Sequence, residues 1–110
     1  KPFIKGARLD NWKGEMKTLA TFENVLCKIS GLVTEADWKT WKESDFKAYL
    51  DLVFESFGTK RLMYGSDWPV CLVAASYKSQ LSIVENYLAS FSVSEKFNVM
   101  GNNAHRFYNL

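Results

Sequence analysis

The stretch Arg61–Val70 reads Arg-Leu-Met-Tyr-Gly-Ser-Asp-Trp-Pro-Val and contains the clearest structural signal in the chain. Its short apolar run predicts a buried strand over residues 61–65. Pro69 prevents the strand from continuing, because proline has no backbone N–H to donate. Asp67 therefore follows the carboxyl end of a buried strand, which is where α/β proteins place catalytic groups. We take Asp67 as the first candidate for a functional residue.

A second strand is expected upstream, over residues 25–29, where Val-Leu-Cys-Lys-Ile ends at Ser30-Gly31. Between the two strands, apolar residues from Phe46 to Phe57 recur at the spacing of an amphipathic helix. Ser44 is the expected N-cap of this helix, and Gly58 fits its C-terminal end. A strand, a long helix and a second strand form a βαβ unit, which predicts two parallel strands with a right-handed crossover.

Further helices are expected on both sides of this unit. The first covers about residues 9–22 and would be capped by Asp10 or Asn11. Ser92 to Glu95 forms a capping box, and Gly101 could interrupt the last helix. Residues 34–38 are expected to form a polar loop with one helical turn. The apolar positions with helical spacing are Leu9, Trp12, Met16 and Leu19, then Tyr77, Leu81, Val84, Leu88 and Phe91, then Phe97, Met100, Ala104 and Phe107.

Only two strands are visible, which is too few for a complete parallel sheet. Such sheets are normally buried on both faces, and two strands leave both edges open. We therefore expect a helix-rich α/β fold in which residues 1–110 form one incomplete domain, part of a larger sheet or barrel. The chain also begins at Lys1 without a methionine or a signal peptide, which suggests a fragment or a cleaved product.

Composition excludes several functional classes. Of the 110 residues, 47% are hydrophobic and 15% aromatic, so the chain is not disordered by composition. A net charge of +2, with basic residues spread along the chain, gives no reason to expect a nucleic-acid partner, and no apolar run is long enough for a membrane span. Cys27 and Cys71 fit no zinc motif. We expect both to be buried thiols in a reducing compartment, the cytoplasm.

Four segments carry a family resemblance. Residues 27–38 (Cys-Lys-Ile-Ser-Gly-Leu-Val-Thr-Glu-Ala-Asp-Trp) and residues 61–70 resemble the last two βα units of a lactonase-type member of the amidohydrolase superfamily. Residues 103–108 (Asn-Ala-His-Arg-Phe-Tyr) resemble its closing helix, and Lys1-Pro2 resembles the residues after its sixth barrel strand. The group includes L-fuconolactone hydrolases and dicarboxylate-pyrone lactonases. The resemblance covers essentially the whole chain and implies the C-terminal part of a TIM-type (β/α)8 barrel.

The resemblance also implies a chemistry. The aspartate after the last strand, here Asp67, would act as base or proton shuttle for water attack on a sugar lactone or related cyclic ester. It would also touch a divalent metal such as zinc if one is used. The family's His-X-His pair and its later histidines have no counterpart in this chain. We therefore expect no metal to be held by residues 1–110 alone, and the isolated chain to be inactive.

Substrate-binding candidates come from the strand ends. Because side chains alternate along a strand, Lys28 and Ser30 share the face that would point into a barrel, while Cys27 and Ile29 point to the helices. Lys28 could bind an anionic group of the substrate, pair with Asp67, or lie in water at an edge. Trp68, and less directly Trp38, could stack on a sugar-like ring or pack as a large apolar side chain.

Other readings remain open at this point. His105 is the only histidine, so it cannot form a metal site by itself and is expected to be a surface or packing residue. The chain could be a decarboxylase of the same superfamily. It could also be a non-catalytic α/β fragment that associates with itself through its open sheet edges. The expected partners are thus a small lactone-like molecule and the remaining barrel strands or a second copy.

Overall fold

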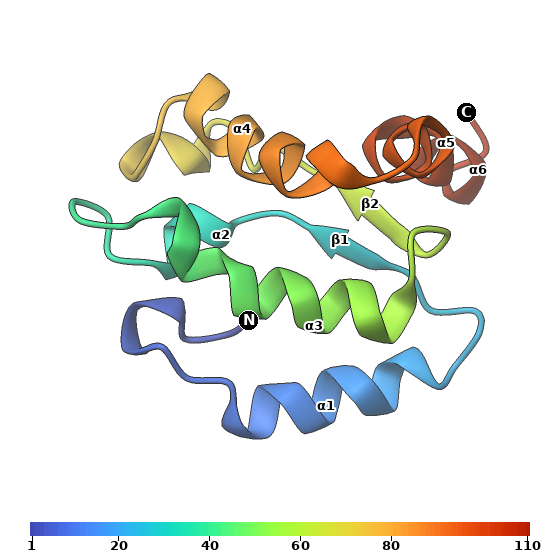
Figure 1. Ribbon diagram of the computed structural model, residues 1–110, viewed down its shortest axis with the longest axis horizontal. Helices are drawn as coiled ribbons and strands as arrows, with labels where there is room; N and C mark the ends of the chain where they lie inside the picture. The colour runs from blue at the N-terminus through green and yellow to red at the C-terminus, as the bar shows by residue number, and fades with distance from the viewer.

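The computed structural model describes all residues 1–110, and its two strands lie side by side and parallel (Figure 1). Strand β1 (Cys27–Ile29) pairs with β2 (Leu62–Tyr64), with Cys27 opposite Leu62 and Ile29 opposite Tyr64. The α-helices are α1 (Asp10–Ala20), α2 (Leu32–Glu35), α3 (Lys47–Phe57), α4 (Tyr77–Tyr87), α5 (Val93–Phe97) and α6 (Asn103–Phe107). Short 3-10 turns cover Ile4–Gly6, Glu43–Phe46, Val70–Val73 and Leu88–Ser90, and a π-helical turn, Asn98–Asn102, joins α5 to α6.

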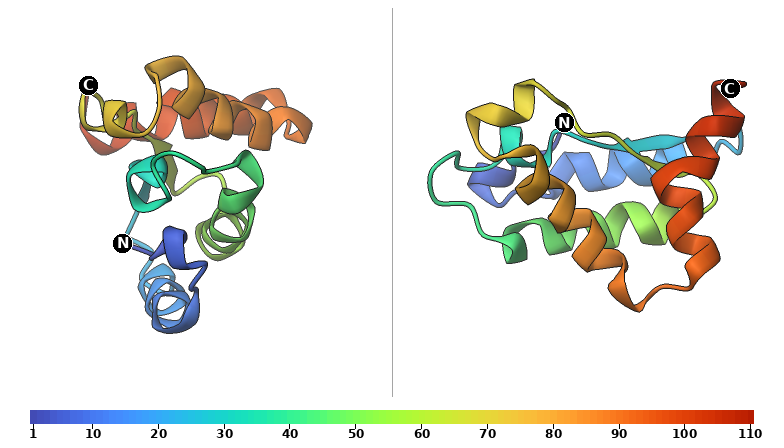
Figure 2. Two further views of the ribbon diagram at one scale, coloured as in Figure 1. Left: turned by 90° about the vertical axis from the view of Figure 1, so that its left-hand side faces the viewer. Right: turned by 90° about the horizontal axis from the view of Figure 1, so that it is seen from above.

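The βαβ prediction is confirmed: α3 connects the two parallel strands. Seen from above, α3 and α4 lie on the same side of the strands (Figure 2, right). Ile29 and Leu62, on the strand face that meets these helices, are buried in the hydrophobic core. Every apolar position in the predicted stripe from Phe46 to Phe57 is also buried. The core thus lies between one face of the sheet and its two long helices.

Both strands are shorter than the sequence indicated. The Val25 N–H donates to the Phe22 carbonyl at 3.0 Å, so this residue belongs to a turn and not to the ladder. The Arg61 guanidinium donates to the carbonyl of Ala20, the last residue of α1, at 2.9 Å, and to the carbonyls of Phe22 and Val25 in the following turn at 3.0 and 3.2 Å. Arg61 therefore joins α1 to the start of β2.

Two predicted helix caps are wrong. The first helix begins at Asp10 itself, and neither Asp10 nor Asn11 caps it through a side chain. Ser44 lies inside the 3-10 turn Glu43–Phe46, and α3 begins only at Lys47. The turn is instead closed by Asp45, whose carboxylate accepts the Lys42 N–H at 2.9 Å. The capping box from Ser92 to Glu95 and the helix end at Gly58, with φ of +67°, are confirmed.

The stripes of the other helices are less buried than predicted. In α4 the buried residues are Gln80, Ile83 and Val84, while Tyr77 is exposed. In α1 no residue is fully buried, although Trp12 and Met16 pack against the core. Helix α1 lies at the periphery, where a single side is covered, as Figure 2 (left) shows. None of the helices combines the length and apolar character that crossing a bilayer requires.

The C-terminal helices are tied to β2 through a buried amide. Asn103 is 1% exposed, and its side-chain N–H groups donate to the carbonyls of Thr59 and Leu62 at 2.7 and 2.6 Å. Arg106 donates in turn to the Asn103 side-chain oxygen. The predicted break at Gly101 corresponds to the π-helical turn, which shifts the helix register just before Asn103.

Candidate functional site

Asp67 lies three residues beyond β2, in a loop that leaves the strand with an unusual backbone conformation. Its φ is +57°, a left-handed value that few residues other than glycine adopt. The Asp67 carbonyl accepts the Cys71 N–H at 2.8 Å, so the loop leads directly into the 3-10 turn Val70–Val73. Backbone conformations of this kind cluster at functional sites. The half-buried carboxylate thus occupies the strand end at which the sequence placed it.

The neighbouring strand end holds the Asp67 carboxylate. Thr34, in α2 just after β1, donates its hydroxyl to Oδ2 at 3.2 Å. Gly31, buried and with φ of +70°, lies so close that an added methyl group would be 3.3 Å from Oδ2. The carboxylate accepts no other side-chain hydrogen bond in this chain, which leaves Oδ1 able to take a proton or contact a cation. Residues from both strand ends therefore meet at this carboxylate.

Lys28 and Ser30 meet over Gly65, on the sheet face opposite the helices. A methyl group added to Gly65 would lie 3.1 Å from Cδ of Lys28 and 3.2 Å from Cβ of Ser30. Lys28 is exposed, and Ser30 is half-buried. The lack of a side chain at Gly65 therefore leaves room for the Lys28 stem along this face. The expected alternation, with Ile29 packed in the core, is confirmed.

The two candidate tryptophans are both exposed. Trp68 is 62% exposed, and its backbone N–H donates to Oγ of Ser66 at 3.2 Å. Trp38 is 54% exposed, and its indole N–H donates to the Thr34 carbonyl at 2.9 Å. Trp38 thus has a defined structural role, since it holds the end of the turn that carries Thr34. Trp68 follows Asp67 directly in the chain, and its indole N–H donates no hydrogen bond within the chain.

Some predicted partners do not meet. Lys28 forms no ion pair with Asp67: the ion pairs of this structure join Lys1 to Glu35 and Lys47 to Asp51. His105 is exposed on α6, and no group of three His, Cys, Asp or Glu side chains is arranged to hold a metal. The prediction of two buried thiols is confirmed for Cys71 only: Cys27 is half-buried. Both thiols are free. Burial raises the pKa of Cys27 to about 11, which keeps this thiol unreactive.

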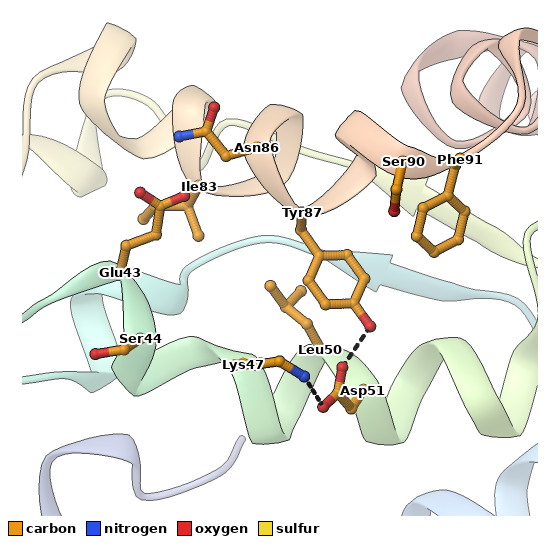
Figure 3. A pocket seen from close by; sticks show the side chains of 10 residues that line it. All are labelled: Glu43, Ser44, Lys47, Leu50, Asp51, Ile83, Asn86, Tyr87, Ser90 and Phe91. Carbon is orange, nitrogen blue, oxygen red and sulfur yellow. Dashed lines mark hydrogen bonds and ion pairs between the residues drawn. The ribbon is translucent and has the colours of Figure 1, made fainter.

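A separate groove lies between α3 and α4 (Figure 3). It has a volume of about 450 Å³, and Leu50 and Tyr87 form part of its wall. Asp51 accepts hydrogen bonds from Lys47 and from the Tyr87 hydroxyl, both at 2.7 Å. Burial and the neighbouring Asp51 raise the pKa of Tyr87. Because the hydrogen-bonded side chains of this groove link α3 to α4, we interpret it as a contact between the two helices.

The amidohydrolase family model matches residues 1–110, the whole of the chain. The chain belongs to the amidohydrolase family. Among curated amidohydrolase relatives, L-fucono-1,5-lactonase of Burkholderia multivorans is 45% identical over 107 residues, which are 93% of this chain and 36% of the relative. L-fucono-1,5-lactonase of Burkholderia ambifaria is 36% identical and matches all of this chain and 39% of the relative.

Solved amidohydrolase structures agree with the fold described above. The crystal structure of an amidohydrolase from Burkholderia multivorans with bound zinc superposes on the whole chain with a TM-score of 0.91 at 42% identity. The chain covers 41% of that structure. This amidohydrolase chain therefore spans little more than a third of the curated lactonases that it matches. It has the helix-rich architecture of part of a larger enzyme fold.

Proposed function

We propose that residues 1–110 form the C-terminal βα units of a (β/α)8-barrel hydrolase that opens a sugar lactone or a related cyclic ester. The family match and the two lactonase relatives support the reaction class. The observation that carries the proposal is the carboxylate of Asp67, held at the carboxyl end of β2 by a donor from the neighbouring strand end. In barrel enzymes this end of the strands carries the active site.

In the proposed reaction, water adds to the lactone carbonyl and Asp67 accepts the proton that the water gives up. The bond between the carbonyl carbon and the ring oxygen then breaks. The ring oxygen takes a proton and becomes a hydroxyl group, while the carbonyl carbon becomes a carboxylate. The product is an open-chain hydroxy acid, so one water is consumed and one proton is released at neutral pH. Oδ1 of Asp67 is the oxygen available for the proton, since Oδ2 is bound by Thr34.

Three side chains are proposed to bind the substrate. The Lys28 ammonium, whose stem runs over Gly65, would attract the oxygen that becomes negative as the ring opens. Ser30, on the same face, would donate to or accept from a sugar hydroxyl. Trp68 would stack its exposed ring on the apolar face of the sugar. Together with the Asp67 carboxylate, the proposed site would thus contain one cation, one hydroxyl and one aromatic ring.

Asp67 fits a divalent metal such as zinc, because carboxylate oxygen is a common ligand for this ion. When bound, the metal would polarise the carbonyl and make water more acidic. This chain would supply one ligand, Asp67, and the others would come from outside residues 1–110. The compartment expected for such an enzyme of carbohydrate metabolism is the cytoplasm, with which the free thiols of Cys27 and Cys71 agree.

The test is lactonase activity of the longer protein that contains this chain, with L-fucono-1,5-lactone first and other sugar 1,5-lactones beside it. We expect Asp67→Asn to lower kcat by at least about 100-fold, because it removes a general base. Asp10→Asn, which changes an exposed aspartate on α1 in the same way, should leave kcat unchanged. Full activity of Asp67→Asn would reject the proposed role. If the gene encodes only residues 1–110, the proposal that this chain is part of a (β/α)8 barrel is wrong.

A further inference from the structure

The turn that carries Thr34 is fixed from several directions. It begins at Gly31 in the left-handed conformation, and Val33 and Ala36 on either side of Thr34 are buried in the core. The Trp38 indole N–H donates to the Thr34 carbonyl at 2.9 Å. The turn therefore cannot rotate or slide without losing buried contacts. Its one hydrogen bond across to the β2 loop is the Thr34 hydroxyl on Oδ2 of Asp67.

We propose that Thr34 is a positioning residue for Asp67, and that the α2 turn acts as a rigid arm that selects which carboxylate oxygen is used. The inference rests on the proposed function of Asp67 and extends it to a residue on the other strand. Thr34 would touch neither water nor substrate. It would act through Asp67, by holding Oδ2 and so directing Oδ1 toward the substrate side.

The physical reason lies in the freedom of a short carboxylate. The two oxygens of an aspartate exchange places when the last torsion rotates, and this torsion has broad minima. A general base works only when its oxygen lies within hydrogen-bond reach of the proton it removes. A hydroxyl donor on Oδ2 distinguishes the two oxygens without adding a charge, which a lysine at this position could not do. A misplacement of about 1 Å can lower a rate about 100-fold.

The structure excludes a simpler explanation for Thr34. Its hydroxyl does not satisfy a backbone group of its own helix, as the Thr18 hydroxyl does by donating to the Gly14 carbonyl at 3.0 Å. The donor and the acceptor of the Thr34 bond are instead 33 residues apart in the chain. Removing the hydroxyl therefore changes the link between two strand ends and leaves the backbone of α2 satisfied.

The test compares Thr34→Val, Thr34→Ser and the double variant Thr34→Val/Asp67→Asn in the longer protein, with L-fucono-1,5-lactone as the probe. Valine keeps the shape and removes the donor, whereas serine keeps the donor. We expect Thr34→Val to lower kcat by about 10- to 100-fold with KM within about twofold, and Thr34→Ser to recover most of kcat. In the Asp67→Asn background, Thr34→Val should cause no further loss, because the two residues act as one unit. Thr18→Val is the matched control and should match the wild type.

The outcomes separate this inference from the proposed function. Wild-type kcat in Thr34→Val beside an inactive Asp67→Asn would overturn the positioning role and leave Asp67 in place. Full activity of Asp67→Asn would overturn both. Equal losses in Thr34→Val and Thr34→Ser, or additive losses in the double variant, would also overturn the positioning role. If Thr34→Val does not fold, Trp38→Phe removes only the indole donor that holds the Thr34 carbonyl, and it should lower kcat in the same direction without raising KM.

Discussion

Gly31 and Gly58 both have positive φ, but only Gly31 touches the candidate site. A methyl group on Gly31 would be 3.3 Å from Oδ2 of Asp67, whereas a methyl group on Gly58 would meet nothing within 4 Å. Alanine at either position costs about 1 kcal/mol or more, because the left-handed region disfavours a Cβ. Only at Gly31 would alanine also displace the carboxylate.

We therefore expect Gly31→Ala to lower kcat for lactone opening by about tenfold or more in the longer protein, following the sensitivity of a base to misplacement. Gly58→Ala should lower the unfolding temperature at least as much, because its ψ of 170° lies in a region that is almost exclusive to glycine. Its kcat should stay at the wild-type value. Equal losses of kcat in both variants would mean that general instability, and not contact with Asp67, explains the effect.

Among single residues, the sequence indicated Asp67 but not Thr34 and Gly31, the residues that contact its carboxylate. Asp67 could be proposed as a functional residue because a strand, a stop signal and a single carboxylate follow one another within ten residues. Thr34 could not, since it looked like one polar residue in a loop and its partner is 33 residues away. The glycine at position 31 was visible, but only the structure shows that it faces a carboxylate.

Helices α3 and α4 are linked at Asp51, which accepts hydrogen bonds from Lys47 on its own helix and from Tyr87 on α4, and the contribution of these bonds to stability depends on pH. Hydrogen bonds from Lys47 and Tyr87 lower the pKa of Asp51 below its ordinary value of 3.8. A carboxylate whose pKa is lower in the folded state stabilises the fold above its unfolded pKa, and this contribution is lost as pH falls through the folded pKa. The side chains of Lys47 and Asp51 are 71% and 47% exposed, so water screens much of the effect.

We expect Asp51→Asn to lower the free energy of unfolding by about 1 kcal/mol or less at pH 7, given this exposure. The difference from the wild type should shrink below about pH 4 and approach zero as Asp51 becomes protonated in the folded protein. Urea unfolding of both proteins at a series of pH values measures it. Asp10→Asn is the control for a change of one surface charge. A difference that persists unchanged at low pH would show that the carboxylate charge at Asp51 is not what matters.

Element boundaries were predicted less well than element types. The helices and both strands exist where periodicity indicated them, because a buried face imposes a regular spacing on the sequence. The ends depend on local competition instead. Ser44 lost the role of cap because Asp45 reaches back to the Lys42 N–H and closes a 3-10 turn before α3 can begin. Tyr77 has helical spacing but is exposed, since the end of α4 extends past the part of the core that covers it.

The whole molecule exposes more surface to solvent than a complete monomer of the same mass would. A complete monomer of 12.6 kDa would expose about 6,200 Å², whereas this chain exposes 6904 Å². The sheet has two strands, so both outer edges lack a strand partner. At the edge of β2, the Asn103 amide takes the Leu62 carbonyl that a further strand would otherwise bind. The sequence indicated an incomplete sheet for the same reason, since only two strand signals could be found in it.

Expressed alone, residues 1–110 should therefore show no lactonase activity and should associate with themselves as concentration rises. Open strand edges pair readily with other chains, and a two-strand sheet has little stability of its own. Sedimentation velocity over a 100-fold range of concentration measures association, and the L-fucono-1,5-lactone assay measures activity. The longer protein, whose added strands would cover both edges, is the control and should keep one sedimentation coefficient over the same range. An isolated chain that remains a monomer and unfolds cooperatively would show that α3, α4 and Asn103 protect the sheet sufficiently. Lactonase activity in that monomer would further show that the missing strands are dispensable, against the barrel proposed here.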